Sequence, residues 1–151
     1  MSWIYKGNEI KSLGDFGKDI MGFVYCTTHI PTGKSYIGKK FLVHTQKRKL
    51  SKKDLKVYEG SPGRPPKYKL VSKESDWESY YSSNKTILEL LKLESKSNFT
   101  RQILHLCKCK KELTYFETKY QFLYEVLEKP DKYFNDNILG KFFTRDFGDL
   151  K

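Results

Sequence analysis

Glu117 is the residue whose surroundings in the sequence most suggest chemistry. It lies in a segment of helical periodicity, directly after Phe116 and three residues before Tyr120. The positions three and four residues away on either side hold no lysine or arginine; they are Leu113, Thr114, Tyr120 and Gln121. A helical carboxylate without a local ion-pair partner is either solvated at the helix edge or kept for a function. A carboxylate that faces a basic groove is what a phosphodiester-cleaving site needs to hold a divalent cation.

A concentrated block of positive charge provides a candidate for such a groove. The 151 residues hold 29 lysines and arginines against 18 acidic residues, which gives a formal net charge of +11. Residues 39–73 hold twelve of the basic residues and only Asp54 and Glu59 as acids, so +10 of the +11 falls there. Such a block predicts a polyanionic partner, with nucleic acid ahead of an anionic membrane surface.

The composition also argues against several classes of protein. The longest apolar runs are a few residues, far below the roughly 20 residues of a membrane-spanning helix. The N-terminus lacks the layout of a secretory signal. The three cysteines, Cys26, Cys107 and Cys109, form no CxxC pair, which disfavours a disulfide framework or a structural zinc site. We therefore expect a cytoplasmic protein without a membrane partner.

A β-hairpin is expected just before the basic block. Residues 22–29 are rich in β-branched and aromatic side chains, residues 31–33 read Pro-Thr-Gly, and residues 35–41 resume the strand pattern. The pattern predicts two antiparallel strands joined by a turn. A third strand is expected over residues 98–107.

Two helices are expected to flank these strands. Residues 82–84 read Ser-Ser-Asn, an N-cap signal before a helix with apolar residues on one broad face. Residues 110–127 form the stronger helix, because apolar side chains recur there at steps of three and four, and Pro130 follows. The fold class is therefore α/β: a small α+β sandwich with a central three-stranded antiparallel sheet flanked by helices.

The remaining segments carry weaker signals. Residues 41–50 are compatible with a short helix. Residues 57–72 are expected to form an exposed loop, because the sequence Gly-Ser-Pro-Gly-Arg-Pro-Pro at 60–66 excludes a regular helix or central strand. We expect three parts: a loosely structured lead-in over residues 1–20, a single domain over 21–140 with a basic insert at about 39–73, and a tail over 141–151.

The predicted hairpin contains two tripeptides, Phe23-Val24-Tyr25 and Tyr36-Ile37-Gly38. Together with the β-β-α-β-α order of elements from residue 22 to about 138, they resemble the GIY-YIG nuclease family. The likeness is greatest to the Seg-type phage members, which are related to homing endonucleases. The first tripeptide departs from Gly-Ile-Tyr but keeps the tyrosine. The resemblance implies a GIY-YIG-like fold and, for a phage-encoded member, the host cell cytoplasm.

The resemblance also implies metal-dependent hydrolysis of double-stranded DNA. By this likeness Glu117 would bind one divalent cation, Mg²⁺ with Mn²⁺ as a substitute, and Tyr25 or Tyr36 would take the proton from the attacking water. A free phenol titrates near pKa ~10, so nearby cationic charge must assist. Three residues are candidates for that charge: Arg48, Lys39 and Lys40.

Three further positions of the family pattern leave alternatives open. Family members carry an arginine, often with a histidine nearby, soon after the second motif. Arg48 lies 12 residues beyond Tyr36, and Arg64 is the alternative. His44 would be an auxiliary acid or base, or else a surface histidine. A late asparagine that orients the site would be Asn135, favoured by the preceding Tyr-Phe, or Asn137.

The insert is expected to hold DNA. Only 13 residues follow Ile138, so we expect no separate recognition domain and predict low sequence specificity. A homodimer on DNA or a partner protein would lengthen the contact. The alternative function is a catalytically weak or inactive nucleic-acid-binding module on the same fold. DNA contacts are assigned to Lys39, Lys40, Lys47, Lys49, Lys52, Lys53, Arg64, Lys67 and Lys69.

Overall fold

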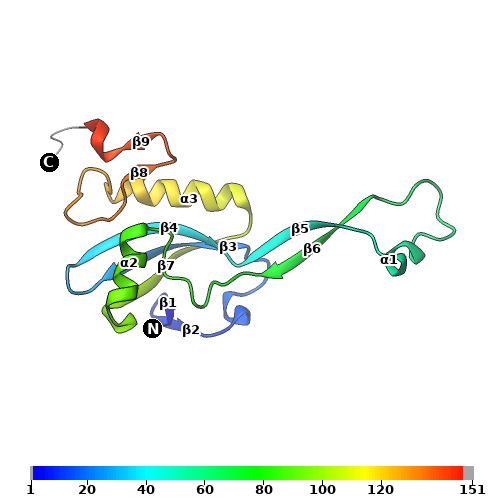
Figure 1. The fold of residues 1–151 in the computed structure, drawn as a ribbon, viewed down its shortest axis with the longest axis horizontal. Helices are drawn as coiled ribbons and strands as arrows, with labels where there is room; N and C mark the ends of the chain where they lie inside the picture. Colours follow the sequence, from blue (N-terminus) through cyan, green and yellow to red (C-terminus); the bar gives the residue numbers. More distant parts are fainter. Residues whose placement is uncertain (1, 148–151) are drawn as a thin grey trace. The chain divides into compact units, whose positions relative to one another are not determined.

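The computed structural model describes residues 2–147 of the chain (Figure 1). The chain divides into two compact units: residues 1–42 with 76–151 form the first, and residues 43–75 form the second. Met1 of the expected lead-in and residues 148–151 of the expected tail lie outside the described residues. Within residues 2–147 no helix combines the length and apolar content that a bilayer crossing needs.

The first unit contains a five-stranded mixed sheet in the order β2-β1-β7-β3-β4. The hairpin predicted from the sequence is confirmed, since β3 and β4 are antiparallel neighbours with Tyr25 opposite Gly38. The third expected strand, β7, pairs antiparallel with β3. The strands are β1 (Trp3–Tyr5), β2 (Asn8–Ile10), β3 (Gly22–His29), β4 (Lys34–Phe41) and β7 (Phe99–Cys107).

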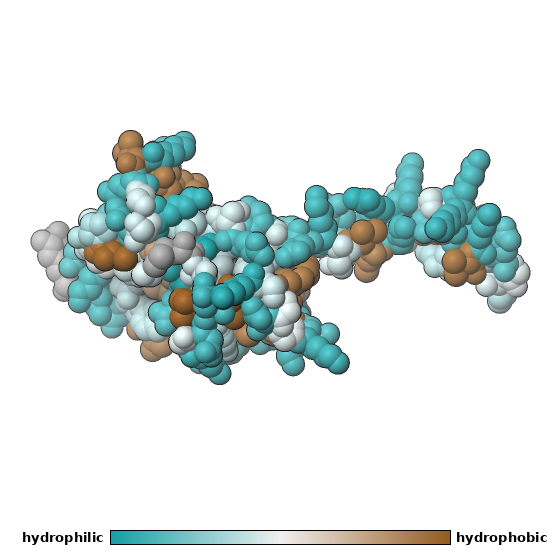
Figure 2. All heavy atoms as spheres, turned by 90° about the horizontal axis from the view of Figure 1, so that it is seen from below, coloured by the Kyte–Doolittle hydropathy of each residue, from teal (hydrophilic) through white to brown (hydrophobic). Residues whose placement is uncertain are grey.

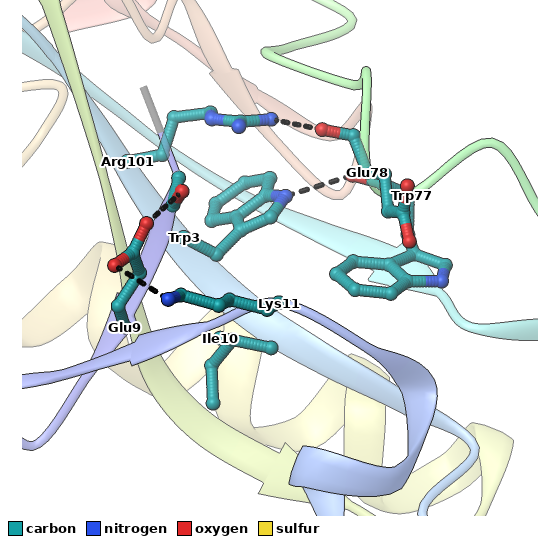
Figure 3. A pocket seen from close by; sticks show the side chains of 8 residues that line it. Trp3, Glu9, Ile10, Lys11, Trp77, Glu78 and Arg101 are labelled. Atoms are coloured by element: carbon teal, nitrogen blue, oxygen red, sulfur yellow. Dashed lines mark hydrogen bonds and ion pairs between the residues drawn. The ribbon is translucent and has the colours of Figure 1, made fainter.

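The predicted three antiparallel strands are present as β7, β3 and β4, but the sheet has five strands rather than three, because the lead-in adds β1 and β2. β1 runs parallel to β7, which makes the sheet mixed. Trp3 holds this short strand in place: its ring lies edge-on to Phe23 at 4.9 Å, and its Nε1 donates to the Trp77 carbonyl at 2.7 Å (Figure 3). Burying one tryptophan removes roughly 150–250 Å² from water, which compensates for the small number of ladder hydrogen bonds.

Two helices, α2 (Lys85–Leu93) and α3 (Lys110–Leu123), lie on opposite faces of the sheet (Figure 1). The alternation of β4 shows this, because consecutive strand residues point to opposite faces. Tyr36 packs against the cluster that contains Ile87 of α2. Ile37, the next residue, belongs to the core cluster that contains Leu113 of α3. The helices thus enclose β4 from both sides.

The helix expected over residues 110–127 ends at Leu123 instead. Glu125 has a φ of 55°, which lies in the left-handed region and stops the helix. Val126 and Leu127 remain buried in the core, so the apolar periodicity continues past the end of the helix. The smaller elements of this unit are η1 (Leu13–Phe16), η2 (Lys96–Asn98), β8 (Asn137–Ile138), β9 (Phe142–Phe143) and η3 (Thr144–Phe147).

The second unit, residues 43–75, is a two-stranded ribbon that we call the basic arm. β5 (Val43–Lys49) pairs antiparallel with β6 (Tyr68–Glu74), and the short helix α1 (Lys52–Lys56) lies between them in sequence. The expected helix over 41–50 is therefore wrong. The expected exposed loop over 57–72 is confirmed for residues 57–67 and wrong for residues 68–72, which belong to β6. The Ser51 hydroxyl caps α1 by accepting from the Asp54 N–H, which places the helix after β5 rather than within it.

Candidate active site

A cavity of about 670 Å³ lies beside β4 in the first unit. Its walls come from parts of the chain that are far apart in sequence: β4, the start of α2, α3, and residues 134–139. It has carboxylate, hydroxyl, amide and amino groups among its lining residues. The polar residues are Tyr36, Ser83, Asn84, Lys85, Thr86, Glu117, Gln121, Asn135, Asp136 and Asn137.

The two motif tyrosines differ in their access to this cavity. Tyr36 lines it, with its hydroxyl 3.3 Å from the Ser83 hydroxyl. Tyr25 is completely buried, with its hydroxyl 3.4 Å from that of Tyr80. Burial raises the pKa of Tyr25 well above its ordinary value, and burial together with the Glu117 charge raises the pKa of Tyr36. Tyr36 is the tyrosine that a water in the cavity can reach.

The space around Gly38 explains why the second tripeptide ends in glycine. A Cβ on this residue would lie 2.6 Å from the Tyr25 hydroxyl oxygen and 2.7 Å from a ring carbon of Tyr36. The two tyrosine rings, with centroids 6.2 Å apart, therefore occupy the space above the glycine. The glycine sets the positions of both tyrosines by leaving room for them.

Glu117 reaches the cavity from α3 and has a partner that is distant in sequence. Burial raises the pKa of the Glu117 carboxyl, while the charge and the backbone N–H of Lys39 on β4 lower it. The Lys39 ammonium donates to the Thr114 hydroxyl of α3 at 3.1 Å, which holds it on the same side of the sheet. The Glu117 carboxylate, which has no basic residue three or four positions away on its own helix, is thus partly desolvated and lies beside Lys39.

Asn135 binds the exposed edge of β4 through its side chain. Its Oδ1 accepts from the Ile37 N–H at 3.0 Å, and its Nδ2 donates to the Ile37 carbonyl at 2.9 Å. Gln121 donates to the same carbonyl at 3.1 Å. Next to it, the Phe134 N–H donates to the Ser35 carbonyl at 2.8 Å, so this segment continues the ladder of the sheet. Sequence reasoning missed Gln121, although its spacing of four residues from Glu117 places both on one helix face.

The family model described as "Putative endonuclease segE, GIY-YIG domain" matches residues 3–138. The chain belongs to this GIY-YIG family. No curated protein and no solved structure matches it significantly. The match begins at Trp3, so the family's region includes the two strands that the sequence analysis assigned to the lead-in.

The remaining predicted site residues of this GIY-YIG domain are Lys40, Asn137 and those of the basic arm. Lys40 pairs with Asp76, and its ammonium lies 4.0 Å from the centre of the Tyr80 ring. It points to the opposite side of β4 from Lys39, since the two are consecutive. Asn137 lines the cavity and accepts from the Gly140 N–H at 3.1 Å. The basic arm carries His44, Lys47, Arg48, Lys49, Lys52, Lys53, Arg64, Lys67 and Lys69.

Two groups of side chains are candidates for a metal site in the first unit. His105, Cys107 and Glu112 have ligand atoms within 4.8 Å of one another. However, burial raises the pKa of the Cys107 thiol to about 12. This opposes formation of the thiolate, which is the form of cysteine that binds a metal. The cavity instead offers the Glu117 carboxylate, with Asp136 also among its lining residues. Oxygen donors of this kind suit Mg²⁺ or Mn²⁺, so Glu117 is the better candidate.

Proposed function

We propose that this chain is a DNA endonuclease that hydrolyses phosphodiester bonds with one divalent cation, Mg²⁺ or Mn²⁺. The observation that carries the proposal is the cavity that contains both Tyr36 and Glu117 in a chain of the GIY-YIG family. Nucleases of this family typically use a divalent metal. The substrate would be double-stranded DNA, and the ten basic residues of the basic arm support a contact with its phosphates.

Glu117 would hold the cation. Its partial burial strengthens electrostatic interactions, and Lys39 helps to keep it ionised. A divalent cation bound there would polarise the phosphoryl oxygens and stabilise the leaving oxygen. Lys85, at the start of α2, lines the same cavity and would offer positive charge to the scissile phosphate.

Tyr36 would take the proton from the attacking water. It is the motif tyrosine that lines the cavity, whereas Tyr25 is fully buried beneath it. Tyr25 would act by positioning Tyr36 through the packing above Gly38. Asn135 would orient the site by fixing β4 rather than by touching the substrate. Arg48 remains a candidate for stabilising the transition state, with Arg64 as the alternative.

Conversion of supercoiled plasmid to nicked circles tests the proposal. The purified full chain should nick in the presence of Mg²⁺ or Mn²⁺ and not in the presence of a chelator. Glu117→Gln should lower the rate by at least about 100-fold, as loss of one main electrostatic contact does, while DNA binding stays intact. Glu112→Gln is the matched control, because Glu112 lies on the same helix but does not line the cavity. Nicking by Glu117→Gln at the wild-type rate would contradict the metal assignment.

The two tyrosines provide a second matched pair. Tyr36→Phe should lower the nicking rate by about 100-fold or more, since general-base catalysis contributes typically 10²–10⁴-fold. Tyr25→Phe removes a buried hydroxyl that contacts Tyr80, at 3.4 Å, and Ser82, and it should lower the rate much less. The opposite order would assign the proton transfer to Tyr25. Tight DNA binding without cleavage of any DNA would favour the alternative function, a nucleic-acid-binding module without activity.

A further inference from the structure

The basic arm is a ribbon whose two faces are both open. In β5 and β6 only Val43 and Val71 are partly buried, and the other strand residues are exposed. Hydrophilic residues cover most of the arm on the face that Figure 2 shows. Ten basic and three acidic residues give residues 43–75 a net charge of +7. An isolated two-stranded ribbon is marginally stable in water, so these features point to a ribbon built to lie against a polyanion.

The register of the ribbon divides its side chains between two faces. Residues directly opposite each other in an antiparallel pair point to the same face. Arg48 lies opposite Lys69, Gln46 opposite Val71, and His44 opposite Lys73. We call these six residues the Arg48 face. The other side, the Lys47 face, consists of Val43, Thr45, Lys47, Lys49, Tyr68, Leu70, Ser72 and Glu74.

The Arg48 face is more positive than the Lys47 face: it holds Arg48, Lys69 and Lys73, whereas the Lys47 face holds Lys47, Lys49 and the acidic Glu74. Arg48 and Lys69 are directly opposite like charges, an arrangement that destabilises a ribbon. Lys69 also pairs with Asp54 of α1 at 2.8 Å, and this contact holds the pKa of Asp54 below its usual range. The Asp54 carboxylate offsets part of the repulsion between Lys69 and Arg48, and a polyanion lying on this face would offset the rest.

We infer that the Arg48 face of the basic arm lies in the major groove of B-DNA, where Arg48 and Gln46 read base edges. The inference rests on the proposed function, because it specifies how the same DNA substrate is recognised. The major groove, about 12 Å wide, admits a two-stranded ribbon. Arginine binds guanine there through two hydrogen bonds, and glutamine binds adenine in the same way.

The spacing of the two side chains fits this geometry. Residues two apart in a strand lie about 6.8 Å apart, which equals about two base-pair steps of B-DNA at 3.4 Å each. Arg48 and Gln46 therefore reach bases separated by about two steps. A face with two such side chains reads a short sequence of a few base pairs. This agrees with the low sequence specificity predicted from the sequence. On this inference Arg48 determines specificity, and Arg64 is then the arginine that would stabilise the transition state.

Selection of preferred sequences from a random DNA duplex library tests the inference. The full-length Glu117→Gln variant serves as the binding protein, so that the substrate is not cleaved. We expect a short motif containing guanine. In gel shifts, Arg48→Ala should reduce discrimination against a changed guanine by about 5- to 150-fold, and Gln46→Ala should do the same at an adenine. Circular dichroism should confirm that both variants are folded.

Lys47→Ala is the matched control on the opposite face. It should weaken binding to all sequences equally and reduce the salt dependence by about 0.9 in the slope of log K against log salt, without changing the motif. Loss of base preference in Lys47→Ala but not in Arg48→Ala would overturn the assignment of faces. Equal competition by double-stranded RNA, whose deep and narrow major groove excludes side chains, would overturn groove insertion.

The outcome separates this inference from the proposed nuclease activity. If the wild-type chain nicks DNA but the selection returns no base preference, the groove assignment fails and the nuclease proposal stands. If the selection returns a motif that depends on Arg48 but the wild-type chain cleaves no DNA, the groove assignment stands and the nuclease proposal fails. If Arg48→Ala abolishes nicking of selected DNA while the motif and affinity are unchanged, Arg48 belongs to catalysis and the inference is wrong.

Discussion

Asn135→Ala should destabilise the protein, because Asn135 completes the hydrogen bonding of a buried strand edge. β4 is the last strand of the sheet, so the Ile37 N–H and carbonyl on its outer edge have no strand partner. Ile37 is fully buried, which keeps water from these groups. The Asn135 amide binds both, at 3.0 Å and 2.9 Å. The substitution leaves the N–H without that acceptor, whereas Gln121 still donates to the carbonyl.

The size of the effect follows from these bonds. Each intramolecular hydrogen bond contributes about 0.5–1.5 kcal/mol net, and a buried donor left without a partner costs about 1–3 kcal/mol. The expected loss for Asn135→Ala is therefore about 2–4 kcal/mol, a large fraction of the roughly 5–15 kcal/mol of a typical domain. Asn137→Ala provides the matched control. The Asn137 side chain accepts from the Gly140 N–H in an exposed turn. Asn137→Ala should therefore lower the free energy of unfolding by about 1 kcal/mol or less.

Urea unfolding followed by circular dichroism measures these free energies by linear extrapolation. A double variant sharpens the assay, because Gln121 and Asn135 donate to the same carbonyl. Gln121→Ala in the Asn135→Ala background removes the last of these donors. The free energy of unfolding of the double variant should therefore fall by more than the sum of the decreases in the two single variants. A stabilising role for Asn135 would be refuted if Asn135→Ala lowered the free energy of unfolding by less than about 0.5 kcal/mol but abolished nicking. Asn135 would then act on the substrate.

Three further substitutions test the packing and charges around the site. Gly38→Ala should lose about 1–3 kcal/mol of unfolding free energy from overpacking, whereas Gly14→Ala, with its nearest neighbour at 3.8 Å, should lose less in the same urea assay. Trp3→Ala should lose about 3–5 kcal/mol, which thermal unfolding would detect. Burial raises the pKa of Glu117, so the affinity for Mn²⁺, measured by titration of the protein at several pH values, should begin to fall at a higher pH than an ordinary glutamate would give. Lys39→Met should move this fall to still higher pH, because Lys39 lowers that pKa; an unchanged pH dependence would contradict the pairing.

Strong local patterns made part of the fold predictable. The β-branched run over β3, the Pro-Thr-Gly turn and the resumed strand pattern in β4 all favour one hairpin, which the structure contains. The Ser-Ser-Asn sequence predicts the start of α2, and the Asn84 side chain does accept from the Ile87 N–H. In these elements the local signal and the tertiary packing agree, and no distant residue is needed to decide the structure.

The missed features depend on distant partners. β1 has only three residues, and Trp3 is held by Phe23 and Trp77, which no local pattern indicates. The Gly/Pro-rich sequence at residues 60–66 led to the prediction of a loop over 57–72. Residues 68–74 nevertheless form a strand, because they pair with β5. Lys39 was named as a source of charge, but its position beside Glu117 follows only from packing of α3 on β4.

The charges of the cavity explain why its chemistry calls for a cation at Glu117. Burial raises the pKa values of both Glu117 and Tyr36, and the Glu117 charge raises that of Tyr36 further. A tyrosine must be ionised to accept a proton from water, and Glu117 must be ionised to hold a cation, so each of these groups opposes the ionisation that the other needs. Lys39 eases the ionisation of Glu117. Positive charge at the carboxylate would favour the charged form of both groups at once, and it would do so where the scissile phosphate also requires it. Under the proposed function, this arrangement would couple the binding of a cation to the activation of Tyr36.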